Sequence, residues 1–175
     1  MLARGQRQVR QRLRVESVAD VLPILPPGRT DAMSKLLYDA DFYAWTQAQA
    51  RALQAKDWPA LDLDHLVEEI ADLGRNIEHE LESRLANLLL HFLKWRYQPE
   101  RRGKSWRNSI LVARQRIARR LRRSPSLRPQ LPAYLVDAYT DARKLAALQT
   151  DLPRTTFPDV CPWSLDQILD EDFFP

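Results

Sequence analysis

The chain has 175 residues and a formal net charge of +4, a length that suits one domain with a hydrophobic core. It has one cysteine and no run of about eighteen apolar residues, so we expect neither an intrachain disulfide nor a membrane span. The N-terminus lacks a secretory pattern, and with the single thiol this predicts a cytoplasmic location. Glycine is scarce while Ala, Leu, Arg and Gln recur, which favours helices over sheets.

The first 32 residues differ from the rest of the chain. They are rich in Arg and Gln and lead into the proline-containing stretch Val21–Gly28, which cannot continue a helix. We predict a poorly packed basic extension over residues 1–32, with Met33 as an alternative start of translation, and a single helical domain over residues 33–175. A loosely docked basic helix over Gln6–Val18 is the other interpretation.

The first clear helix signal follows Tyr38. Asp39 or Asp41 can cap a helix that ends near Lys56, ahead of Pro59. Its predicted buried face holds Phe42, Trp45 and Leu53.

A long central helix is predicted next. Asp62 or Asp64 can cap it, and Pro99 ends it after Tyr97. A bend at Gly74 would divide it into two helices in line, and glycine destabilises a helix by only about 1 kcal/mol relative to alanine, so both forms stay open. Apolar residues recur every three or four positions and are predicted to face inward: Leu66, Ile70, Leu73, Ile77, Leu81, Leu85, Leu88, Phe92 and Trp95.

The remaining helices follow in order. Ser105 is the predicted cap of a third helix that ends at Ser124, and a fourth is expected over Pro129–Gln149, with Leu135, Leu145 and their neighbours inward. Ser164 and Gln167 have the spacing of a capping box for one short last helix. The sequence therefore predicts an all-α fold, a helical bundle of four main helices, one of them long and central, plus a short C-terminal helix.

Charge is distributed very unevenly. Residues 94–128, hereafter the basic block, hold thirteen basic residues and one acidic residue. Residues 33–93 hold five basic and eleven acidic residues, and residues 129–175 hold three basic and eight acidic residues. We favour pairing of this block with acidic segments of the same chain or of a second copy, which predicts a homo-oligomer. Nucleic acid is the alternative partner. Its candidate binding residues are Arg101, Arg102, Lys104, Arg107, Arg119, Arg122 and Arg123, and Trp95, Tyr97 and Trp106 could stack bases.

His91 lies in a leucine-rich run, where an imidazole is either a hydrogen-bonded core residue or a working group. The favoured interpretation is a core residue that donates to a carboxylate or a carbonyl. The spacing of Arg84 and His91 is similar to the motif of HEPN ribonucleases, and that resemblance implies that His91 transfers a proton while Arg84 stabilises a phosphate. Glu69 is the third candidate catalytic residue, although one of Glu68 and Glu69 is also expected to pair with an arginine.

Other chemistry finds less support. On one helix His65 and His79 would lie about 21 Å apart, so they cannot share a metal ion, and we predict no metal or cofactor. Those two histidines are expected at exposed positions. Cys161 lies between Val160 and Pro162 with no cationic neighbour, which is typical of an inert thiol.

Several short segments resemble a known bacterial family. They are Leu37–Trp45, Glu68–Ile70, His91–Trp95, Ser105–Trp106, Ser124–Leu127 and Phe157–Trp163. Together they are similar to the "domain of unknown function 29" family over residues 36–175. The resemblance implies a bacterial helical bundle and carries no established activity. We therefore favour a non-catalytic binding or scaffold module that self-associates, with the ribonuclease and the nucleic-acid-binding protein as alternatives.

Overall fold

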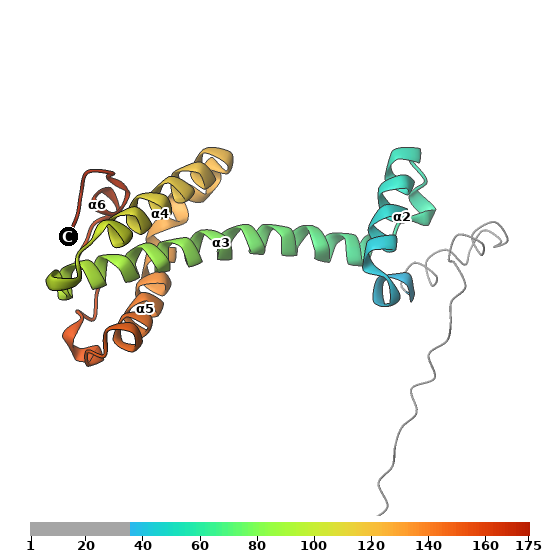
Figure 1. Ribbon diagram of the computed structural model, residues 1–175. Helices are drawn as coiled ribbons and strands as arrows, with labels where there is room; N and C mark the ends of the chain where they lie inside the picture. The colour runs from blue at the N-terminus through green and yellow to red at the C-terminus, as the bar shows by residue number, and fades with distance from the viewer. Residues whose placement is uncertain (1–35) are drawn as a thin grey trace, which may run out of the picture. The chain divides into compact units, whose positions relative to one another are not determined.

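A computed structural model describes residues 36–175 (Figure 1). These residues are mostly helical, without a strand among them, so the all-α prediction is confirmed. None of their helices is long and apolar enough to cross a membrane. The predicted extension over residues 1–32 lies outside the described part of the chain.

The helices have the predicted order. The main ones are α2 (Phe42–Ala55), α3 (Leu63–Tyr97), α4 (Lys104–Arg123), α5 (Leu131–Thr150) and the short α6 (Leu165–Leu169). Short 3₁₀ turns lie between them: η2 (Trp58–Ala60), η3 (Pro99–Arg101), η4 (Pro125–Gln130) and η5 (Arg154–Thr156). The long central helix is continuous through Gly74, so α3 is one helix of 35 residues.

The chain separates into two compact units, the first ending at Glu69 and the second covering Ile70–Pro175. Each unit is described by itself. The sequence-based prediction of a single domain over residues 33–175 stays a prediction.

Local signals set most helix ends. The Asp41 side chain accepts a hydrogen bond from the Ala44 amide, and Ser164 forms the complete capping box with Gln167 that the sequence predicts. The predicted cap at Ser105 is wrong, because α4 already begins at Lys104 behind an extended Gly103. The fourth helix begins at Leu131 rather than Pro129, because the preceding residues form the 3₁₀ turn η4.

The second unit holds the larger core. Figure 1 shows α4 and α5 against the C-terminal half of α3. Leucines of α3 spaced by three or four residues meet apolar side chains of α4, α5 and α6 there. The fully buried core residues of this unit include Leu81, Leu85, Leu88, Phe92, Ile110, Ile117, Ala138, Ala142 and Ile168.

Some predicted core positions are exposed instead. Ile70 and Leu73 belong to the part of α3 that precedes this core, and both are largely exposed. Phe42, Leu53 and Leu145 are also well exposed, because helical spacing identifies an apolar face but not how far a neighbouring element covers it.

Candidate functional site

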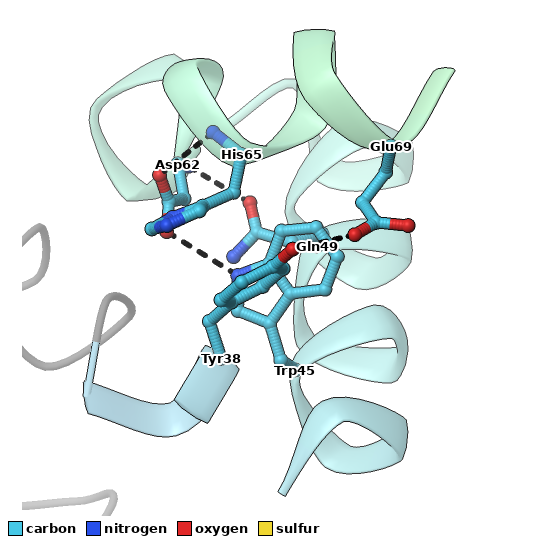
Figure 2. A network of polar contacts seen from close by, with 6 residues as sticks. All are labelled: Tyr38, Trp45, Gln49, Asp62, His65 and Glu69. Carbon is cyan, nitrogen blue, oxygen red and sulfur yellow. Dashed lines mark hydrogen bonds and ion pairs between the residues drawn. The ribbon is translucent and has the colours of Figure 1, made fainter. Parts of the chain in front are cut away.

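A polar network in the first unit surrounds the Asp62 carboxylate, which is 1% exposed (Figure 2). The Trp45 indole donates a hydrogen bond to it at 3.4 Å, and His65 Nδ1 lies 2.7 Å from its Oδ2 atom. The backbone amide of His65 donates to the other carboxylate oxygen, so Asp62 also caps α3. The Asp62 amide in turn donates to the Gln49 side chain at 2.9 Å. We call these four residues together with Tyr38 and Glu69 the Asp62 network.

Hydrogen bonding outweighs burial at Asp62. Burial alone would raise the pKa of this carboxyl group, but the hydrogen bonds from His65 and Trp45 lower it below its ordinary value. The carboxylate is therefore ionised near neutral pH and acts as an acceptor for each donor around it.

Tyr38 closes the network from the segment that precedes α2. Its ring stacks on the His65 imidazole with centroids 3.9 Å apart, and its hydroxyl donates to Glu69 Oε1 at 2.6 Å. This hydrogen bond, together with desolvation and nearby carboxylates, raises the pKa of Tyr38 to about 12. The hydroxyl is therefore a donor at neutral pH.

The network overturns two expectations. His65 is not an exposed helix position, since its side chain is only 24% exposed and is held by Asp62 and Tyr38. Glu69 pairs with Tyr38 rather than with an arginine, whereas Glu68 is exposed. Because each polar group contacts a neighbour within the first unit, the network accounts for the start of α3 without any ligand.

A second cluster, in the other unit, is strongly basic. Five arginines and one glutamate line a hollow of about 320 Å³ between α3 and α4, which we call the arginine hollow. Arg84 and Glu80 come from α3, while four residues of α4 spaced by three or four positions share the face that meets them. Those four are Arg116, Arg119, Arg120 and Arg123.

Glu80 is the acidic side chain among the residues that line this hollow. It forms ion pairs with Arg84 on its own helix and with Arg120 on α4. Five guanidinium groups therefore face one carboxylate, which leaves a local charge of about +4.

The other cations of the basic block form few ion pairs with carboxylates of the described residues. Within residues 36–175, Arg120 is the one cation of the block that lies within ion-pair distance of a carboxylate. Ten of its cations are exposed: Arg96, Arg101, Arg102, Lys104, Arg107, Arg116, Arg119, Arg122, Arg123 and Arg128. The expected pairing of the block with acidic segments of the same chain is thus largely absent from the described residues.

Arg114 differs from the other arginines of α4. Its neighbours Arg116 and Arg119 are exposed, but Arg114 is only 2% exposed. Its guanidinium donates to backbone carbonyls of the C-terminal segment, at 2.9 Å to Ile168 and 2.7 Å to Phe173, with longer bonds to Gln167 and Glu171. It is a structural residue that ties this segment to α4.

The candidate catalytic residues lie in different surroundings. Arg84 lines the arginine hollow, whereas His91 does not, and Glu69 belongs to the first unit. His91 is half-buried, and its Nδ1 atom is buried without a hydrogen-bond partner, so that atom does not make the expected bond to a carboxylate or carbonyl. Burial lowers the pKa of His91, and the nearby Lys94 ammonium lowers it further.

The candidate nucleic-acid residues divide into two sets. Arg119 and Arg123 line the arginine hollow, while Arg122 is exposed outside it. The other four, Arg101, Arg102, Lys104 and Arg107, are exposed at and before the start of α4. Sequence reasoning missed Glu80, Arg116 and Arg120, although the spacing of Arg116, Arg119, Arg120 and Arg123 was a readable signal of one shared face.

The nearby aromatic side chains are already engaged. Lys94 lies over the Trp106 ring at 4.9 Å and Arg102 over the Trp95 ring at 5.5 Å. Tyr97 packs edge-on against Phe157. These contacts leave the aromatics less suited to stacking on bases than the sequence suggests.

Cysteine chemistry and metal binding find no support within residues 36–175. Cys161 is half-buried and burial raises the pKa of its thiol, which is consistent with an inert cysteine. Across residues 36–175, no three His, Cys, Asp or Glu side chains are placed to bind a metal ion together.

Comparisons with known proteins agree with the resemblance seen in the sequence. A family model described as "Domain of unknown function DUF29" matches residues 37–174, which is most of the chain. Searches of curated proteins and of solved structures gave no match.

Proposed function

The chain belongs to the DUF29 family, and we propose that it is a non-catalytic module that binds the phosphate backbone of nucleic acid through α4. One observation carries this proposal. Five arginines converge on one hollow in which Glu80 is the acidic residue, so the site has a surplus of positive charge. A phosphate group supplies the negative charge and the acceptor oxygens that guanidinium groups bind well.

Further exposed cations of the basic block lie on and near α4. Arg101, Arg102, Lys104 and Arg107 lie at and before the start of α4, and Arg119, Arg122 and Arg123 lie near its end. Because α4 has 20 residues and rises about 1.5 Å per residue, its cations are distributed over about 30 Å of helix length, on more than one side of the helix. They add positive charge around the hollow, which attracts a polyanion.

The chemistry of α4 favours phosphates over bases. Its exposed face is dominated by arginines rather than by short polar side chains that read base edges, and the neighbouring tryptophans are covered by cations. We therefore expect binding with little sequence preference and a steep dependence on salt.

The proposal is tested by fluorescence anisotropy with labelled duplex DNA and single-stranded RNA over a series of salt concentrations. The test variant replaces Arg116, Arg119 and Arg123 with Gln. The control replaces Arg51, Arg128 and Arg154 with Gln, three exposed arginines that do not line the hollow. Both variants lose three positive charges, so a difference between them reports position rather than net charge.

We expect the test variant to bind more weakly at every salt concentration. For duplex DNA, the slope of log K against log salt should become shallower by roughly 2 to 3, because each lost phosphate contact removes about 0.9. The control should stay much closer to the original chain. No binding at low salt, or equal losses in both variants, would contradict the proposal.

The ribonuclease alternative has less support, because His91 does not line the hollow that Arg84 lines. Incubation of the same RNA with the original chain and with His91→Ala tests it directly. Cleavage that is lost in a folded His91→Ala variant would establish catalysis. Intact RNA with both proteins agrees with a binding module. A nucleic-acid-binding role also fits the cytoplasmic location that the sequence predicts.

A further inference from the structure

The arginine hollow is a small concavity with walls from two helices. Arg84 and Glu80 stand on the α3 side, and the other arginines that line it stand on the α4 side. Its volume of about 320 Å³ lies at the small end of the range for ligand pockets, which is roughly 300 to 1,000 Å³. The hollow therefore has room for one small group, whereas a continuous nucleic-acid strand has to lie across its mouth.

The arginines of the hollow differ in what already holds them. One oxygen of the Glu80 carboxylate accepts a hydrogen bond from Arg84 Nε at 3.2 Å, and the other oxygen pairs with Arg120. This carboxylate therefore holds one guanidinium group from each helix in place before a ligand arrives. The other three arginines of the hollow are exposed and form no ion pair with residues 36–175: Arg116, Arg119 and Arg123.

A phosphate at the end of a nucleic-acid strand differs from one within it in charge and in oxygen atoms. An internal phosphodiester carries one negative charge and has two oxygens without an ester link. A terminal phosphomonoester carries about −1.5 to −2 at pH 7 and has three such oxygens, because its second pKa is about 6. In the field of a hollow with a charge of about +4, the monoester gains up to about twice the Coulomb energy and can accept a further charge-assisted hydrogen bond.

We propose that the arginine hollow binds the terminal phosphomonoester of a nucleic-acid strand, while exposed cations of the basic block outside the hollow hold the backbone that follows. This inference rests on the proposed function and names the part of the nucleic acid that enters the hollow. A strand end can enter because the chain continues from one side of its phosphate only. Guanidinium groups from both α3 and α4 then surround its three oxygens.

The proposal is tested by fluorescence anisotropy at low salt with three single-stranded RNAs, each labelled at the end opposite to the one compared. The first has a 5′-phosphate, the second has the same sequence with a 5′-hydroxyl, and the third is a 5′-hydroxyl strand longer by two nucleotides. The third strand matches the full charge of the first, so it controls for charge alone. A second set with 3′-phosphates covers the other end of the strand.

We expect the phosphorylated strand of at least one set to bind roughly tenfold more tightly than both of its controls, the effect of one additional charge-assisted hydrogen bond. Equal, salt-dependent binding of all strands would overturn the terminal-phosphate site and leave the proposed function intact. No binding of any strand at low salt would overturn both.

Two variants locate the preference in the hollow. Replacing its three exposed arginines with Gln should make phosphorylated and hydroxyl strands bind alike. The matched control replaces three exposed cations outside the hollow with Gln: Arg101, Lys104 and Arg122. It should weaken binding of every strand but keep the ratio between them, and circular dichroism checks that both variants keep their helices. A preference that survives in the first variant, or is lost in the control, would contradict the assignment.

Two further measurements identify the bound group. The preference should shrink between about pH 7.5 and about pH 5.5, because the monoester takes up a proton with a pKa of about 6. The strands are compared at the same pH, so any change in the protein affects all of them, and an unchanged preference would exclude recognition of a dianion. A nucleoside 5′-monophosphate should compete only weakly, since it has no backbone. Competition as strong as that of the phosphorylated strand would overturn the strand end as the ligand.

Discussion

The Asp62 network and the arginine hollow are both polar clusters, but they differ in how far their groups are satisfied by neighbours. Asp62 receives hydrogen bonds from Trp45 and His65, so its carboxylate oxygens are satisfied by donors inside the first unit. In the arginine hollow five guanidinium groups share Glu80. A buried cluster whose polar groups are hydrogen-bonded to one another stabilises local structure, whereas a surplus of one charge on an open surface indicates a ligand of the opposite charge.

The largest effect should follow removal of the Asp62 carboxylate. Asp62→Ala takes away the α3 cap and leaves the Trp45 and His65 donors without their acceptor, so we expect a loss of about 3 kcal/mol in the stability of the first unit. Hydrogen exchange of amides 42–69 measures this loss. Asp57→Ala, at an exposed aspartate without a capping bond, is the control and should change little. The account also expects Asp62→Ala to leave nucleic-acid binding unchanged. A loss of binding affinity in this variant as large as its loss of stability would contradict the separate roles of the two clusters.

Acid should weaken the Asp62 network specifically. Because the folded state lowers the pKa of Asp62, its carboxylate stabilises the fold above the unfolded pKa of about 3.9, and this contribution is lost as pH falls through the folded value. The stability difference between the original chain and Asp62→Asn should therefore be full at neutral pH and shrink below about pH 4. A difference that grows on acidification would have the wrong sign.

Glu80→Gln tests the charge surplus of the arginine hollow by removing its carboxylate. Removing this carboxylate raises the positive charge of the hollow and frees Arg84 and Arg120 to bind phosphate, so nucleic acid should bind several-fold more tightly. Stability should fall by no more than about 1 kcal/mol, because these ion pairs are partly exposed. Glu82→Gln, on the same helix but outside the hollow, is the matched control, and an equal gain there would point to net charge alone.

The smallest effect concerns His91. Its pKa is lowered in the folded state, so stability is complete above the unfolded pKa of about 6.5 and decreases as pH falls toward the folded value. Denaturant unfolding of the original chain and of His91→Gln at pH 7 and pH 5 measures this. The variant should lose less stability on acidification. If both proteins lose the same stability between pH 7 and pH 5, the pKa of His91 does not differ between the folded and unfolded states, and the prediction is wrong.

Local features of the sequence were enough to predict the helices. Asp41 and Ser164 cap helices through side chains that reach backbone amides three residues away, so their role can be read from spacing alone. Pro99 likewise marks the end of α3 for steric reasons that need no tertiary information.

Long-range contacts limited the prediction of the sites. Arg114 resembles its exposed neighbours in sequence, and it is buried because its carbonyl partners lie more than fifty residues away. Glu80 joins the arginines of α4 only because the fold packs two helices together. His65 was predicted to be exposed because neither the Tyr38 ring nor the geometry of the Asp62 carboxylate follows from helical periodicity.

The central claim is that the arginine hollow is a phosphate-binding surface. The most direct measurement is the salt dependence of duplex DNA binding by the original chain and by the variant in which Arg116, Arg119 and Arg123 are replaced with Gln. The account predicts tight binding at low salt, a steep loss with added salt, and a clearly shallower slope in the variant. Equal slopes for the two proteins, or no binding by the original chain at low salt, would contradict it.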